Sequence, residues 1–192
     1  MKLFNLLFLI FPLLIFTQNR LPDLQLKKST DNNNDVNNTF KIRKNEIAIS
    51  FYTNGGLGYH YEIDNFIFDN NNQVRYEKSK IYYKKGKKYK KEIISLSQEE
   101  QDKLTKIIHS DLFATFSKYS QSNFQYSENN HQICANGSID DAPENFIMIT
   151  QNAMQSTIMV YLPKNNITCS SADSPLMKFI ELHRLFGIEI ER

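Results

Sequence analysis

Residues 46–68 read EIAISFYTNGGLGYHYEIDNFIF. Side chains alternate with a period of two in EIAISFY, so that Ile47, Ile49 and Phe51 share one face. The alternation resumes in YHYEIDNFIF after the glycine-bearing break TNGGLG. Successive side chains of a β-strand point to opposite faces of a sheet, so a period of two is typical of strands. The stretch therefore predicts two antiparallel strands joined by a turn.

The strand pattern continues on both sides of Gly86. Residues 74–85 read VRYEKSKIYYKK and residues 87–96 read KKYKKEIISL, which extends the hairpin to a four-stranded antiparallel meander. A second hairpin is predicted where NFIMIT and STIMVYL flank the turn QNAMQ, residues 151–155.

Two segments carry helix signals instead. Ser97 is followed three residues later by Glu100, which is a capping-box pattern, and the apolar residues after it recur at helical spacing. This first helix is expected to end between residues 111 and 118. Ser174 precedes Pro175 at the start of the second helix, and Gly187 is expected to end it.

The element order is ββββ-α-ββ-α, and strands and helices occupy separate runs of the chain. Such segregation favours the α+β class over a parallel α/β fold. We predict an antiparallel sheet of about six strands with two helices packed on one face. The other face is expected to be wetted and rich in Tyr, Lys and Glu.

The segments ISFYTNGGLGYHYEI, LSQEEQDKL, FIMIT and LMKFIELHRLF occur in an order that resembles uncharacterised exported α+β proteins of Bacteroidetes. The resemblance covers about residues 45–188. It implies this architecture and export, and it transfers no active-site residue. Some of those families carry a cysteine pair in the first turn, where this chain has NGGLG.

The N-terminus has the composition of an export signal. Lys2 precedes an apolar run, residues 3–16, which is shorter than the roughly 20 residues that a spanning helix needs. We predict a signal peptide over residues 1–17, a flexible Asn-rich linker over 18–43 and a single domain over 44–192. The mature chain is then exported, periplasmic or secreted, without a transmembrane segment. The alternative is an N-terminal helix buried in the fold.

The two cysteines are Cys134 and Cys169. In an exported protein a pair favours a disulfide, and the midpoint of the pair falls near the predicted second hairpin turn. The metal alternative adds His131 and lacks a fourth ligand. We predict the disulfide, and no metal and no cofactor.

Local catalytic signals are weak. The loop NGGLG is followed by a strand rather than the helix that a phosphate site needs. The four histidines, at positions 60, 109, 131 and 183, match no nucleophile or metal motif, and each is expected at the surface or a rim. Asp140, Asp141 and Glu144 are interpreted as part of a solvated loop, with a weak cation site as the alternative.

The most unusual stretch is the hairpin around Gly86. Residues 78–91 contain eight lysines and no acid. Without residues 1–17 and this hairpin, the chain has 14 basic and 21 acidic residues, so a near-neutral net charge hides two opposed regions. Three interpretations remain open: lysines that protect an edge strand from aggregation, a site for an anionic polymer, and a site for an acidic protein or for the acidic loop of this chain. Nucleic acid is not expected, because an exported protein rarely meets it.

We therefore expect a non-enzymatic binding module of the cell envelope that uses this hairpin. The binding residues predicted for an acidic envelope polymer or an acidic protein partner are Tyr82, Lys84, Lys85, Lys87, Lys88, Tyr89, Lys90 and Lys91. The alternative is an exported hydrolase with a site between the sheet and the loop at residues 119–143.

Overall fold

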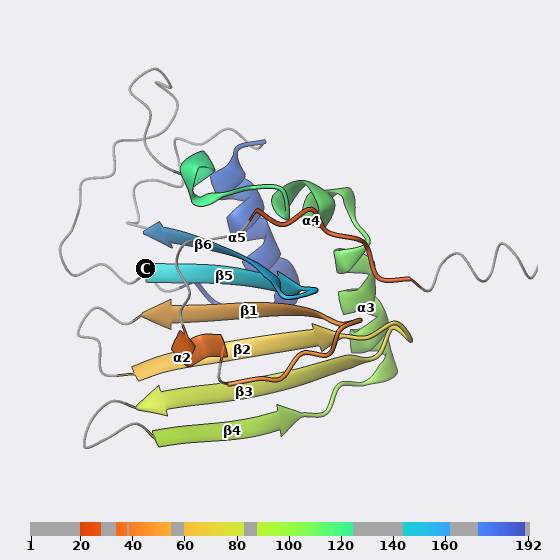
Figure 1. The fold of residues 1–192 in the computed structure, drawn as a ribbon, viewed down its shortest axis with the longest axis vertical. Helices are drawn as coiled ribbons and strands as arrows, with labels where there is room; N and C mark the ends of the chain where they lie inside the picture. The colour runs from red at the N-terminus through yellow and green to blue at the C-terminus, as the bar shows by residue number, and fades with distance from the viewer. Residues whose placement is uncertain are drawn as a thin grey trace, which may run out of the picture.

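The computed structural model describes residues 20–27, 34–37, 39–54, 60–82, 88–124, 144–161 and 173–190. The elements are α2 (Asn34–Asn37), β1 (Ile47–Asn54), β2 (His60–Phe68), β3 (Val74–Tyr82), β4 (Lys88–Ile94), α3 (Gln98–Ile108), α4 (Asp111–Phe116), the 3₁₀ helix η1 (Gln121–Phe124), β5 (Glu144–Gln151), β6 (Met154–Tyr161) and α5 (Pro175–Phe186). Figure 1 shows the six strands side by side in one sheet. The predicted α+β class and antiparallel sheet are confirmed.

The strand order is β4-β3-β2-β1-β5-β6, with every neighbouring pair antiparallel. β1 to β4 form the predicted meander, and the second hairpin adds to the free side of β1. Ile49 of β1 therefore lies between Phe66 of β2 and Ile149 of β5. The strand that opens the domain is thus central, and β4 and β6 are the two edges.

The second hairpin turns at Asn152 and Ala153, both with positive φ, of 51° and 62°. Two residues with positive φ between paired strands match the right-handed twist of a hairpin. The turn predicted near Asn152 is confirmed.

The helix signals also hold, with one difference. Ser97 caps α3 in the capping box with Glu100, and Ser174 and Gly187 bound α5 as predicted. The first helical segment is broken, however, because the Ser110 side chain accepts a hydrogen bond from the Phe113 backbone N–H and starts α4. The break turns α4 so that Phe113 and Phe116 both enter the core.

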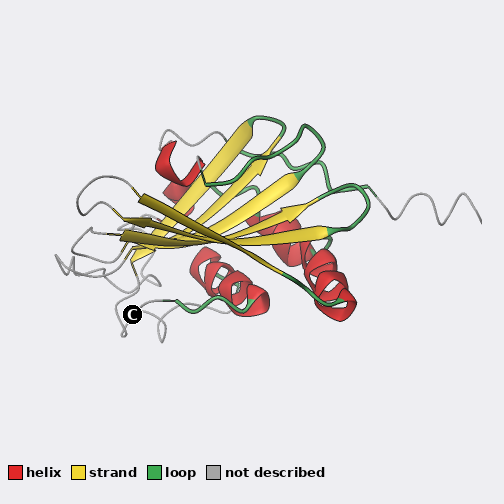
Figure 2. Cartoon of the chain, turned by 90° about the horizontal axis from the view of Figure 1, so that it is seen from below, coloured by secondary structure: helices red, strands yellow, loops and turns green. Residues whose placement is uncertain are grey.

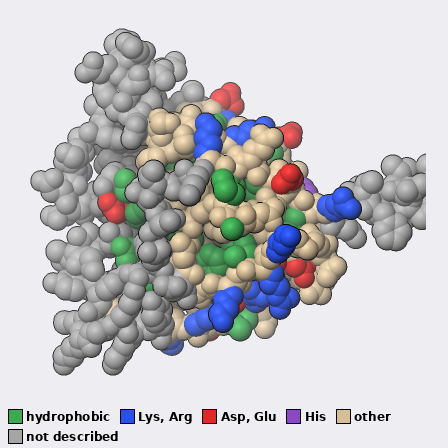
Figure 3. All heavy atoms as spheres, viewed as in Figure 1, with side chains coloured by type: hydrophobic (Ala, Val, Ile, Leu, Met, Phe, Trp, Pro, Cys, Tyr) green, Lys and Arg blue, Asp and Glu red, His purple; other side chains and the backbone are tan. Residues whose placement is uncertain are grey.

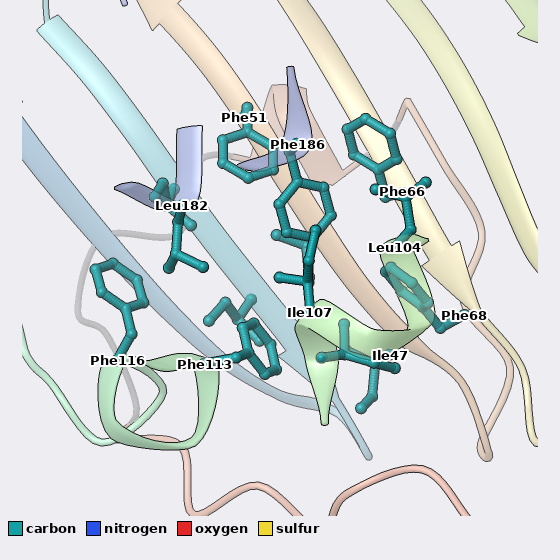
Figure 4. Close-up of a cluster of buried hydrophobic side chains, with 14 of the residues drawn as sticks. Ile47, Phe51, Phe66, Phe68, Leu104, Ile107, Phe113, Phe116, Leu182 and Phe186 are labelled. Atoms are coloured by element: carbon teal, nitrogen blue, oxygen red, sulfur yellow. The ribbon is translucent and has the colours of Figure 1, made fainter. Parts of the chain in front are cut away.

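The main core lies between the sheet and α3, α4 and α5, which Figure 2 shows on one side of the sheet. This side is called the helix face. Phe186 of α5 lies between Phe51 and Phe66 of the sheet, with ring centroids 4.9 and 5.0 Å apart (Figure 4). Odd-numbered residues of β1 and β5 and even-numbered residues of β2 supply the sheet side of this core.

The opposite face carries a second, smaller core, which corrects the expectation that this face is wetted. Val36 and Phe40 are buried against side chains of the sheet, among them Tyr52 and Ile63. The helix α2, which carries Val36, lies on the opposite side of the sheet from the other helices (Figure 2). Hydrophobic side chains remain visible in the middle of this face, with Lys and Arg around them (Figure 3).

Buried hydrogen bonds fix this segment to the sheet. The Ser50 hydroxyl donates to Asn65 Oδ1 at 2.6 Å, and Asn65 Nδ2 donates to Thr39 Oγ1 at 3.2 Å. The Thr39 hydroxyl in turn donates to the Val36 carbonyl at 2.7 Å. Because polar groups are costly to bury unless paired, this chain of bonds allows Asn65 to lie in an apolar layer.

Residues 20–27 also pack on the domain. Leu26 is buried in the main core, and Gln151 accepts a hydrogen bond from the Leu24 N–H and donates one to the Pro22 carbonyl, both at 2.8 Å. The expectation of a flexible linker therefore does not hold for residues 20–27 and 34–43 where the structure describes them. The predicted signal peptide, residues 1–17, lies outside the described residues.

Candidate functional site

The predicted binding hairpin lies at one edge of the sheet. β3 and β4 pair from Tyr76 with Ile94 to Tyr82 with Lys88. Lys84, Lys85 and Lys87 lie outside the described residues, as do the side chains of Lys88 and Tyr89. Of the other predicted residues, Lys90 and Lys91 are exposed and Tyr82 is 40% exposed. The structure thus describes the base of the hairpin.

On the helix face, acids of β2 pair with lysines of β3. Lys78 Nζ lies 3.4 Å from Asp64 Oδ1, and Lys80 pairs with Glu62. The Tyr76 hydroxyl donates to Asp64 at 2.5 Å. Burial first, and then this hydrogen bond, raise the pKa of Tyr76 well above its ordinary range. The bond to Glu62 raises the pKa of Lys80.

On the opposite face, one buried carboxylate pairs with two cations. Glu77 is 3% exposed, and its two oxygens lie 3.0 Å from Arg75 Nε and 2.8 Å from Lys91 Nζ. Arg75 also donates to the Lys41 carbonyl at 2.9 Å, which ties the hairpin to the segment that covers this face.

These ion pairs explain how neighbouring strands can carry many lysines despite the repulsion between like charges. Lys80 of β3 lies directly opposite Lys90 of β4, and like charges in such a position repel. Acids of β2 and β3 offset the repulsion by pairing with Lys78, Lys80 and Lys91. The described ion pairs therefore use three of the eight lysines of residues 78–91, all three of them at the base.

A second site lies at the C-terminal end of α5, and no sequence motif predicted it. It is a pocket of about 310 Å³ between the helix end and the edge of the helix face. We call it the α5-end pocket. Its walls are formed by Phe51, Tyr52, Thr53, Glu62, Asp64, Lys78, His183, Gly187, Ile188 and Glu189.

His183 forms the buried wall of this pocket. It is 2% exposed, and neither ring nitrogen has a hydrogen-bond partner in the described part of the chain. Its ring packs against Phe51 and Phe179 at centroid distances of 4.9 and 4.8 Å. Burial lowers the pKa of His183 to about 3, so the imidazole is neutral near pH 7.

The expectation that every histidine lies at the surface or a rim is wrong for His183. His109 is exposed, as expected, at the end of α3. The helical period carried a signal that could have found His183, because it follows Phe179 by four residues and precedes Phe186 by three. Residues at those spacings share one helix face, and here that face is the buried one.

The other predicted sites stay predictions. Cys134, Cys169, His131, Asp140 and Asp141 lie outside the described residues, so neither the disulfide nor the hydrolase site in the loop at 119–143 is tested. Within the described ranges, no three His, Cys, Asp or Glu side chains are grouped as a metal site would require, and no helix is long and apolar enough to cross a membrane.

Comparisons with known proteins add no family. No protein-family model matches the chain, and no curated protein matches its sequence.

Proposed function

We propose that this protein is an exported, non-enzymatic binding module whose contact surface is the tip of the β3–β4 hairpin, and that its partner is an anionic polymer of the cell envelope. The observation that carries the proposal is the division of charge along the hairpin. At the base of the hairpin, Lys78, Lys80 and Lys91 form ion pairs with acids of the same domain. The tip sequence YKKGKK, residues 83–88, contains no acid.

The paired base supports this function physically. On the helix face, ion pairs join β3 to β2, and on the opposite face Glu77 joins β3 to Lys91 of β4. Tyr82, where β3 ends, is 40% exposed. Clustered lysines attract a polyanion through the summed field rather than through one geometry. Lysine is a compact charge without the bidentate fork of arginine, so we expect attraction that depends on the summed charge more than on the geometry of one sulfate or phosphate group.

The proposal is tested by charge reversal at the tip. The full chain is loaded on heparin-agarose and on phosphocellulose, and eluted by raising salt from about 0.01 M to about 1 M, over which the Debye length falls from ~30 Å to ~3 Å. We expect salt-sensitive retention of the wild type. Reversal of Lys84, Lys85, Lys87 and Lys88 to Glu should abolish it without changing the thermal unfolding midpoint.

A second variant separates the hairpin from net charge. Reversal of Lys41, Lys44, Lys103 and Lys118 to Glu changes the net charge equally, and these four side chains are exposed elsewhere on the domain. This control should keep most of the retention. Equal loss in both variants, or no retention of the wild type on either matrix, would refute the proposed surface.

A further inference from the structure

The charge of the α5-end pocket favours a cation. Three of its wall residues, Glu62, Asp64 and Glu189, carry carboxylates, whereas Lys78 supplies its one cationic side chain. The C-terminal end of α5 also faces it, and a helix C-terminus carries partial negative charge. The local balance is thus opposite to that of the neighbouring hairpin.

The chain itself already places an ammonium group there. Lys78 Nζ lies 3.4 Å from Asp64 Oδ1 and 5.8 Å from the centre of the Tyr76 ring. A carboxylate and an aromatic face are two groups that stabilise an ammonium ion. The Lys78 side chain is half exposed, so it can turn into solvent when another ammonium takes this place.

Beside those charges, the ring nitrogens of His183 lack hydrogen-bond partners among the described residues. A neutral imidazole has one donor and one acceptor nitrogen, and both are buried here without a partner in the described chain. Buried polar groups are generally paired, so an exception calls for a partner that the described part of the chain does not supply. A ligand hydroxyl can donate to the acceptor nitrogen of such a ring or accept from its donor nitrogen.

The remaining wall allows a small ligand to enter. Phe51 and Ile188 provide apolar surface, and nothing lies within 4 Å of the position that a Cβ of Gly187 would take. A volume of about 310 Å³ is at the lower end of the range for small-molecule pockets.

We propose that the α5-end pocket binds a small primary amine that also carries a hydroxyl group, of the size of an amino sugar. Its ammonium group replaces that of Lys78 at Asp64, and its hydroxyl pairs with His183. This site is separate from the hairpin tip. Its ligand and its test are different from those of the polymer-binding function, so either proposal can fail without the other.

The first experiment follows the His183 ring by NMR while glucosamine is added to the full chain. N-acetylglucosamine is the matched control, because it keeps the sugar and loses the positive charge, and gluconate tests an anion of similar size. We expect a saturable shift of the His183 signals with glucosamine at millimolar concentration and none with the two controls. No shift with glucosamine, or an equal shift with N-acetylglucosamine, would overturn the proposal.

Two substitutions give effects of opposite sign. Asp64→Asn keeps an acceptor for Tyr76 and should weaken glucosamine binding about tenfold or more. Lys78→Gln removes the competing ammonium and should tighten binding, by about threefold or more. An anion site predicts the reverse for Lys78→Gln, so weaker binding by that variant refutes an amine ligand.

Controls keep these results interpretable. Lys103→Gln removes an exposed lysine of α3 outside the pocket wall and should leave binding unchanged. Glu189→Gln, at an exposed position, provides a second carboxylate variant if thermal unfolding shows that Asp64→Asn is unstable. Glu189→Gln should weaken binding about threefold, and wild-type affinity in both carboxylate variants would count against the site.

Discussion

The imidazole of His183 packs edge-on against Phe51, with ring centroids 4.9 Å apart and an interplanar angle of 75°. The contact joins α5 to the central strand β1 and encloses a titratable group in the main core. Its burial makes the stability of the fold dependent on pH.

The pKa of His183 is lowered from 6.5 to about 3 by burial. Above pH 6.5 the ring is neutral in both the folded and the unfolded state. Between pH 6.5 and 3 the unfolded state binds a proton that the folded state does not, so the free energy of unfolding falls as pH falls, with a limiting slope of about 1.4 kcal/mol per pH unit. His183→Phe should lose this dependence, and the exposed His109→Gln should keep it. The free energy of unfolding is measured by denaturant titration at several pH values in this window. If it falls equally with pH in the wild type and in His183→Phe, the assignment to His183 is contradicted.

The turn at Ala153 predicts a stabilising substitution. Its φ of 62° is strained for a residue with a Cβ and free of strain for glycine. Ala153→Gly should raise the free energy of unfolding by about 0.5–1 kcal/mol, measured by urea titration. The same change at Ala114, exposed in helix α4, should lower it by about 0.5–1 kcal/mol. Equal signs at the two positions would argue against the two-residue turn.

Phe40 tests whether residues 34–43 belong to the domain. Because it is buried in the second core, Phe40→Ala should lower the free energy of unfolding by about 3–5 kcal/mol. Lys41→Ala, at the exposed neighbouring position, should change it by less than about 0.5 kcal/mol. If neither substitution affects thermal unfolding, the segment is not packed on the sheet in solution.

Glu77 predicts a difference between buried and exposed ion pairs. Glu77→Gln leaves Arg75 and Lys91 without their carboxylate and should cost about 1–3 kcal/mol, less than for a fully buried pair because both cations reach solvent. Glu62→Gln removes an exposed pair with Lys80 and should cost less than about 1 kcal/mol. Chemical denaturation at low salt measures both, and equal costs would contradict the burial of Glu77.

The predicted disulfide between Cys134 and Cys169 is tested by counting thiols in the purified protein. We expect no titratable thiol before reduction and two after it, because an exported pair is oxidised in its compartment. Two free thiols in the unreduced protein would refute the bridge.

Local secondary structure could be predicted without the tertiary structure. The alternation in residues 46–68, the capping pair Ser97 and Glu100, and the Ser174-Pro175 start of α5 each describe a short segment, and each was placed correctly. Such patterns succeed because side-chain period and capping depend on residues within one or two turns or strands. Binding sites did not follow in the same way, since the α5-end pocket joins residues more than 100 positions apart.

The strands, the starts of α3 and α5 and the lysine-rich hairpin could be predicted from the sequence. The tertiary structure was needed to show that β5 adds beside β1, that residues 34–37 and 39–43 cover the opposite face, and that the buried ring nitrogens of His183 have no hydrogen-bond partner among the described residues. The period of a strand or helix reveals which of its faces is apolar. Which segment covers that face depends on how the rest of the chain folds. Val36 and Phe40 looked like isolated apolar residues in a polar linker until the sheet brought Tyr52 and Ile63 beneath them.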